Sequence, residues 1–208
     1  MQSDSGTVFI IDDDADVCQS IKFMVQSVGL AVESFGSAEQ FLSSVVDEPH
    51  GCLITDIRML GMSGLQLLKE IVAMNWELPV IVITGFGDIR MAVESFKAGA
   101  FTFLEKPYRD QELWDAIVEA LAKSKAKQVE RGFKQEVKAR LGKLTIDETV
   151  VLRELLDSTP LKAIATKLNL SLRTIDLRRR SILDKFKVET NIELTKLIVT
   201  SGIPLNEI

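Results

Sequence analysis

The chain has 208 residues, a length that suits two small domains better than one large one. Hydrophobic residues make up 46% and charged residues 26%, so the chain can bury real cores, which excludes wholesale disorder and collagen-like structure. No apolar run approaches the ~20 residues that cross a bilayer, and the polar N-terminal residues lack the hydrophobic segment of a signal peptide. We therefore expect a globular, cytoplasmic protein.

The net charge of −5 combines two regions of opposite sign. Residues 1–122 hold 7 Lys and Arg against 19 Asp and Glu, whereas residues 123–208 hold 18 against 11, so the regions carry −12 and +7. This asymmetry predicts two domains with different partners, and the basic one suits a polyanion. A solvated basic surface remains the alternative that charge alone leaves open.

Short apolar runs rich in β-branched residues predict five strands in the acidic region. The runs are 8–11, 31–35, 52–55, 80–84 and 101–104. Helical patterns lie between them. Their candidate N-terminal caps are Ser37, Ser63, Asp88 and Asp110, and their candidate stop residues are Gly29 and Gly99. Strands that alternate with helices predict an α/β fold, a doubly wound, five-stranded parallel sheet whose working site lies beyond the carboxyl ends of the strands.

Charged and hydroxyl side chains cluster where these predicted strands end. They are Asp12, Asp13, Asp14, Asp56, Thr84, Glu105 and Lys106. Carboxylates at one edge of a sheet need a cation, and hard oxygen ligands with room for water suit Mg²⁺. An acidic run after the first strand would repel a nucleotide phosphate, which argues against flavin and nicotinamide cofactors. With a metal in place, an Asp carboxylate can attack a phosphoryl donor and form an aspartyl phosphate.

A simpler interpretation is that the Asp run only caps the first helix. That would explain Asp14, but not Asp56, Thr84 and Lys106 at the other strand ends.

Four motifs, IIDDD, TDIRM, VITGFGD and FLEKP, make about residues 7–122 resemble the receiver domain of bacterial two-component response regulators. The resemblance implies a flavodoxin-like fold in which Asp56 accepts a phosphoryl group that Thr84 and Lys106 contact, and in which Thr84 and Phe103 form the switch. The ligands that it implies for Mg²⁺ (or Mn²⁺) are Asp12, Asp13, Asp56 and the backbone carbonyl of Arg58. Leu60 stands where the family usually has proline.

A basic stretch follows the predicted receiver. Residues 122–143 carry 8 basic and 2 acidic side chains. From Leu113 through Leu141 apolar residues recur mostly every four residues, with Gly132 as the one strong breaker. Two interpretations stay open: an extension of the last receiver helix that serves as a signalling linker, and a flexible solvated tether. The predicted domains are a receiver at 1–122, a linker at 123–143 and a DNA-binding domain at 144–208.

The remaining residues predict a small all-α domain of four helices. Their start signals are the capping-box pairs Thr145 with Glu148 and Thr190 with Glu193, Pro160 in a first turn, and Ser171 as a cap. The third helix is apolar on one side and rich in arginine on another. Two short helices joined by a tight turn, the second rich in arginine, predict a helix-turn-helix whose recognition helix enters the major groove of DNA.

About residues 141–203 are similar to the LuxR-type helix-turn-helix, through LT, IATKLNLSLRTI and RxxILDKF. By this similarity Asp176, Leu177 and Arg180 face bases, and Arg173, Thr174 and Arg179 contact the DNA backbone. Arg178 replaces the histidine usual in the family, so the DNA sequence cannot be inferred from relatives. An exposed cationic face is the alternative interpretation of the RRR run.

Together the resemblances imply a response regulator of the FixJ/NarL type. By this resemblance we expect a sensor histidine kinase to phosphorylate Asp56, which alters receiver dimerisation and releases or pairs the DNA-binding domain to regulate transcription. The expected partners are that kinase, double-stranded DNA and a second copy of the chain, with no membrane and no enzymatic turnover.

Two alternatives remain. The first is a phospho-independent DNA-binding protein that uses its receiver only for dimerisation. The second is a hydrolase that works through an aspartyl phosphate, which is disfavoured because such phosphatases place a second acid where this chain has Arg58.

Overall fold

The structure is a computed structural model that describes residues 6–85 and 89–204. The chain forms two compact units, Met1–Gln128 and Val129–Ile208. Helix α5 (Asp110–Leu141) begins in the first unit and ends in the second, and it is helical through Gly132. The boundary between the two units, at residues 128 and 129, lies inside the predicted linker, whose limits at residues 123 and 143 stay predictions. The predicted cap Asp88 lies outside the described residues.

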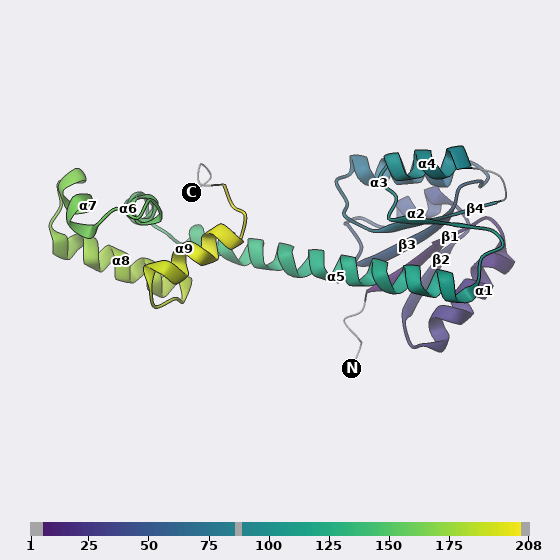
Figure 1. The fold of residues 1–208 in the computed structure, drawn as a ribbon, viewed down its shortest axis with the longest axis horizontal. Coiled ribbons are helices and arrows are strands. Elements are labelled where there is room, and N and C mark those ends of the chain that lie inside the picture. Colours follow the sequence, from purple (N-terminus) through teal and green to yellow (C-terminus); the bar gives the residue numbers. More distant parts are fainter. Residues whose placement is uncertain (1–5, 86–88, 205–208) are drawn as a thin grey trace. The chain divides into compact units, whose positions relative to one another are not determined.

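Five parallel strands form the sheet of the first unit, in the order β2-β1-β3-β4-β5 (Figure 1). They are β1 (Thr7–Ile11), β2 (Ala31–Phe35), β3 (Gly51–Asp56), β4 (Val80–Thr84) and β5 (Thr102–Glu105). The predicted α/β class and its five strands are confirmed. The strand order reverses between β1 and β3, which makes the carboxyl ends of these two strands the topological switch point of the sheet.

Helices cover both faces of the sheet because successive strand residues point to opposite sides. In β1, Val8 and Ile10 face the core under α1 (Ala15–Ser27) and α5, whereas Phe9 and Ile11 face the core under the other helices. Those helices are α2 (Ala38–Ser44), α3 (Gly64–Ala73) and α4 (Ile89–Lys97). Figure 1 shows α3 and α4 on the same side of the sheet.

The second unit packs four helices against the C-terminal turns of α5. The helices are α6 (Ile146–Leu156), α7 (Leu161–Lys167), α8 (Leu172–Phe186) and α9 (Asn191–Thr200). Their shared core includes the fully buried Leu152, Ile164, Ile175 and Phe186. The turn between α7 and α8 holds Asn169 at φ 52°, a left-handed conformation that asparagine tolerates. The predicted four-helix domain is therefore confirmed.

Three predicted helix starts need correction. Asp110 is the first residue of α5 rather than the residue before it, and Pro160 lies just before α7 rather than in its first turn. The capping box at Thr190 is half formed: its side chain accepts from the amide of Glu193, but the Glu193 carboxylate accepts from the amide of Glu189 at 2.9 Å. The Glu189 amide thus takes the place that the Thr190 amide has in a complete capping box.

Glu148 links α6 to α8 through a buried carboxylate. It completes the predicted capping box with Thr145, whose amide lies 2.7 Å away, and it also accepts hydrogen bonds from Ser181 at 2.7 Å and Lys185 at 2.5 Å. Burial alone would raise the pKa of Glu148, but the hydrogen bonds from Lys185, Ser181 and Thr145 outweigh it and lower the pKa to about 2. The ionised carboxylate therefore stabilises the second unit.

We expect Glu148→Gln to lower the free energy of unfolding by about 1–3 kcal/mol at pH 7, because buried donors lose their charged acceptor. The pKa of Glu148 is lower in the folded than in the unfolded chain, so its stabilisation is present above about pH 4.5 and is lost as the pH falls toward about 2. Urea unfolding followed by circular dichroism from pH 7 to pH 2 measures this.

The exposed Glu189→Gln is the matched control, because it makes the same charge change on the same unit. A difference in the free energy of unfolding between Glu148→Gln and the parent chain that stays constant over this pH range would contradict the assignment.

Candidate functional site

The ammonium of Lys106 joins two carboxylates at the switch point of the sheet. Its Nζ lies 3.2 Å from Asp12 Oδ2 and 2.9 Å from Asp56 Oδ2. Asp12 directly follows β1, Asp56 ends β3, and Lys106 directly follows β5, where its amide donates to the carbonyl of Thr84 at 2.7 Å. Because parallel strands end at the same edge, residues that are 94 and 50 positions apart meet here.

Burial makes this pair of carboxylates dependent on a cation. Asp12 is 3% exposed, and burial raises its pKa, as does the charge of Asp56, while the Asp14 amide and the Lys106 ammonium lower it. Burial also lowers the pKa of Lys106, but Asp56 and Asp12 outweigh this, so the pKa of Lys106 is raised and its amine stays charged. The site thus attracts positive charge.

The Asp13 carboxylate contacts a backbone amide in the loop after β3. Its Oδ2 accepts a hydrogen bond from the backbone amide of Leu60, in the loop after β3, at 3.0 Å. Asp14 caps α1 by accepting from the amides of Asp16 and Val17. In the part of the chain that the structure describes, no three His, Cys, Asp or Glu side chains are arranged to hold a metal ion. The predicted ligands therefore divide into Asp12 and Asp56, which lie together, and Asp13, which does not join them.

The other predicted receiver residues lie at or near the same edge. Thr84 ends β4 and is 2% exposed, and its hydroxyl donates to the carbonyl of Gly85 at 3.4 Å. The amide of Arg58 donates to Asp56 Oδ1 at 3.3 Å. Phe103, on β5, packs edge-on against Phe96 of α4, with ring centroids 5.4 Å apart and the ring planes at 87°.

Sequence reasoning missed two contacts at this edge. It gave no sign that Phe96 would pair with Phe103, because aromatic side chains on different elements carry no local signal. It also missed the Leu60 amide as the partner of Asp13, although the absence of proline at position 60 leaves a donor there.

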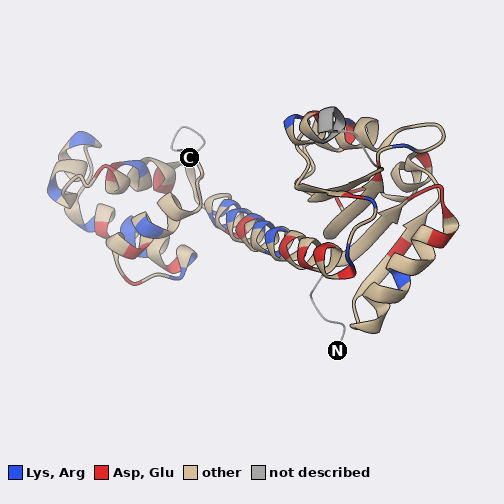
Figure 2. Cartoon of the chain, turned by 45° about the vertical axis from the view of Figure 1, so that its right-hand side comes forward, with Lys and Arg blue, Asp and Glu red and all other residues tan. Residues whose placement is uncertain are grey.

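The candidate DNA-binding residues lie on α8, the second helix of the helix-turn-helix. Ile175, Ile182 and Phe186 bury one side of this helix, while Leu177 is 58% and the Arg180 side chain 68% exposed. Lys and Arg gather along α8 and along the C-terminal part of α5 (Figure 2). The α8 surface is thus basic, with an apolar side chain among the arginines.

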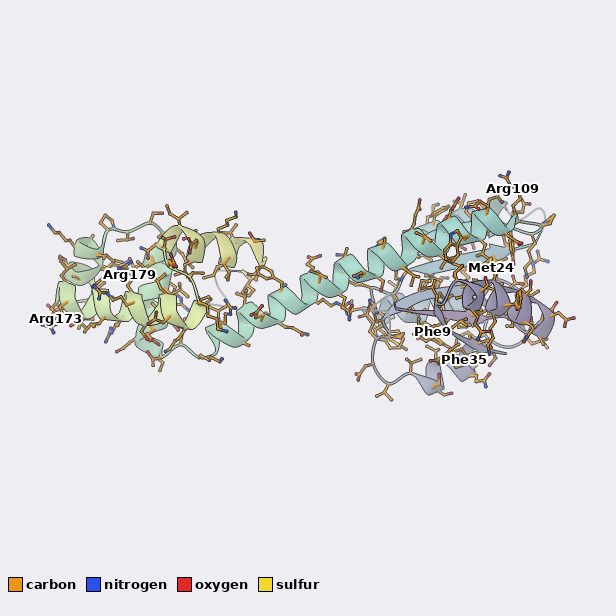
Figure 3. All side chains as sticks on the ribbon, turned by 90° about the horizontal axis from the view of Figure 1, so that it is seen from below. Phe9, Met24, Phe35, Arg109, Arg173 and Arg179 are labelled. Carbon is orange, nitrogen blue, oxygen red and sulfur yellow. The ribbon has the colours of Figure 1, made fainter. Side chains whose placement is uncertain are left out.

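Three of the four arginines of α8 form ion pairs with carboxylates of the second unit. Asp176 accepts from Arg179 at 3.1 Å and pairs with Arg180 at 2.9 Å. Arg178 pairs with Asp147 of α6, a partner that sequence reasoning did not identify. Among the described residues no carboxylate pairs with Arg173, which projects from the first turn of α8 (Figure 3). The side chains of Arg178 and Arg179 are only 23% and 24% exposed.

Comparison with known protein families gives two matches. Residues 8–118 match the response regulator receiver domain, and residues 143–198 match the bacterial regulatory proteins of the LuxR family. The chain belongs to the response regulators. Its family is thus the one that the sequence motifs predict, and the resemblances to both domains are confirmed.

Relatives of this response regulator match it over nearly its whole length. The transcriptional regulatory protein FixJ of Azorhizobium caulinodans is 39% identical over 96% of this chain and 95% of the relative, and FixJ of Rhizobium meliloti is 38% identical over 94% and 96%. Among solved structures, the response regulator StyR has a TM-score of 0.85 at 35% identity, covering 92% of this chain and 97% of that one. Full-length FixJ from B. japonicum has a TM-score of 0.59 at 34% identity, over 95% and 97%.

The two domains define the activity of this response regulator. A FixJ-like receiver joined to a LuxR-type DNA-binding domain makes it a phosphorylation-controlled transcriptional regulator, not a turnover enzyme. Nothing in the comparisons favours a phospho-independent DNA-binding protein. Within residues 6–85 and 89–204, none of the helices is long and apolar enough to cross a bilayer.

We expect Lys106→Met to raise the pKa of Asp12 further in metal-free buffer. The substitution removes the ammonium that lowers this pKa and leaves the opposing charge of Asp56 in place. Titration of the Asp side-chain carboxyl carbons by NMR measures the change. Lys123→Met, an exposed lysine on α5, is the control. An Asp12 pKa that is the same in all three proteins would contradict the coupling.

Proposed function

We propose that Asp56 is the phosphoacceptor of this response regulator and that a sensor histidine kinase is its phosphodonor. The observation that supports this most is the position of the Asp56 carboxylate at the switch point, 2.9 Å from the Lys106 ammonium. A carboxylate oxygen of Asp56 attacks the phosphorus, and the bond from phosphorus to the donor nitrogen, or to the oxygen of a small phosphodonor, breaks. Lys106 and the Thr84 hydroxyl then neutralise and orient the transferred group.

We assign Mg²⁺, or Mn²⁺, to the same edge. The donor set fits a hard cation, because the Asp12 and Asp56 oxygens already share a positive group and the Arg58 carbonyl follows in the next loop. Asp13 completes the set once it leaves the Leu60 amide. When bound, the metal supplies charge neutralisation for the transferring phosphoryl group.

Phosphorylation changes transcription by reshaping the receiver. A phosphoryl group drawn toward Thr84 and Lys106 pulls on the ends of β4 and β5, and Phe103 on β5 transmits this to the ring of Phe96 on α4. We propose that this favours a homodimer and that residues 123–143 link it to the DNA-binding domain at 144–208. We also propose a cytoplasmic location, which a DNA target supports.

We expect acetyl phosphate with Mg²⁺ to add one acid-labile phosphoryl group to the wild type and none to Asp56→Asn, because the amide is not nucleophilic enough to attack. Intact-mass spectrometry measures the product. Asp16→Asn, which changes an exposed carboxylate in the first turn of α1, is the matched control and should be modified like the wild type. Equal modification of Asp56→Asn would reject the assignment.

For DNA, we propose that Arg180 reads a base edge and that Arg173 holds a phosphate. Arg180 is exposed and oriented by Asp176, whereas Arg173 lies in the first turn of α8. The base-facing roles of Asp176 and Leu177 and the backbone contacts of Thr174 and Arg179 stay predictions. A role for Arg178 in DNA binding also stays a prediction, because the ion pair between Arg178 and Asp147 must open before Arg178 can reach DNA.

We expect Arg180→Ala to lose about 1–3 kcal/mol of discrimination at one base position. Arg173→Ala should weaken the binding of all DNA sequences alike and lower the slope of log affinity against log salt concentration by about one unit. Binding titrations on preferred and random duplexes at several salt concentrations separate the two effects, with thermal melting as a control for folding. The base-reading role is wrong if Arg180→Ala lowers affinity for both duplexes by the same factor.

A further inference from the structure

The backbone amide of Leu60 holds a carboxylate of the proposed metal site. Its nitrogen lies 3.0 Å from Asp13 Oδ2, although the two residues are 47 positions apart. Leu60 is 82% exposed, so its contribution here is chiefly the amide. The hydrogen bond ties the loop after β3 to the segment after β1.

A second carboxylate holds the same loop two residues further along the chain. Glu39, in the first turn of α2, accepts from the amide of Met62 at 2.7 Å. Gly61 lies between the two ties at φ 79°, and a β-carbon there would come within 2.8 Å of the Glu39 carboxylate. The loop is therefore fixed at both neighbours of Gly61, and Asp13 is one of the two side chains that fix it.

The position of Asp13 bears on metal binding. Asp12 and Asp56 meet at Lys106, but Asp13 is engaged with Leu60, and none of the described carboxylates forms a group of three arranged for a metal ion. We propose that the Leu60 amide competes with Mg²⁺ for Asp13, so that metal loading breaks this hydrogen bond and releases the loop at Leu60. This inference rests on the proposed function, because it needs Asp13 to be a ligand.

Proline at position 60 removes the competing donor and leaves every carboxylate in place. We expect Leu60→Pro to bind Mg²⁺ about three- to tenfold more tightly than the wild type, the range that one hydrogen bond of ordinary net strength gives. Leu60→Ala keeps the amide and loses the side chain, so its affinity should equal that of the wild type. Isothermal titration of the full chain with MgCl₂, without phosphodonor, measures all three. Equal affinities in Leu60→Pro and Leu60→Ala would overturn the inference.

Amide exchange in the wild type tests the same competition without depending on how the proline variant folds. The Leu60 amide should exchange slowly in metal-free buffer and faster as MgCl₂ is added, as followed by NMR. In Asp13→Ala it should exchange fast from the start. Slow exchange that persists at saturating Mg²⁺ would show that Asp13 keeps the Leu60 amide when the metal is bound, and competition would be wrong.

These outcomes separate the inference from the proposed function. A wild type that binds Mg²⁺ with unchanged Leu60 exchange rejects only the competition. A wild type that binds no Mg²⁺ at millimolar concentration rejects the metal assignment, and the inference with it.

Discussion

The receiver depends on one shared charge, the Lys106 ammonium between the carboxylates of Asp12 and Asp56. Asp12 is nearly fully buried, and a buried anion is costly unless a cation accompanies it. Lys106 stands 94 residues later in the chain and reaches Asp12 only because β1 and β5 end at one edge of the sheet. The sheet order thus brings together the three charged groups on which the site is built.

In the function that we propose, the same arrangement makes the site responsive to phosphorylation. Two carboxylates and one ammonium leave one negative charge, and a phosphoryl group on the proposed acceptor Asp56 would replace the charge of that carboxylate with a larger one. The Lys106 backbone is hydrogen-bonded to the carbonyl of Thr84, so a pull on its ammonium acts on the ends of β5 and β4 together. The ring pair of Phe103 and Phe96 connects β5 to α4, and we propose that it carries the effect of the added charge to the receiver surface. Phosphorylation-controlled transcription is the output of this family.

The sequence was informative where structure follows from local pattern. Short apolar runs predicted five strands within one residue of their observed ends. The parallel sheet then predicted that Asp12, Asp56 and Lys106 would meet. Capping rules located Ser63 and Thr145 because those contacts span three residues.

Apart from the helix starts at Asp110, Pro160 and Thr190, the contacts that the sequence did not reveal join distant segments. The Leu60 amide takes Asp13 away from the other carboxylates, and Asp147 of α6 takes Arg178 of α8, with no local signal for either. Glu148 illustrates both cases: its bond to Thr145 was predictable, whereas those to Ser181 and Lys185 need the packing of α6 on α8.

The central claim is that charge added at Asp56 controls how the second unit binds DNA. It is tested most directly by measuring affinity for duplexes selected from random DNA by this protein, with and without Mg²⁺ and beryllofluoride as a phosphoryl mimic. The account predicts that beryllofluoride raises the affinity of the wild type and leaves that of Asp56→Asn unchanged. An equal response in both proteins, or none in the wild type, would contradict it.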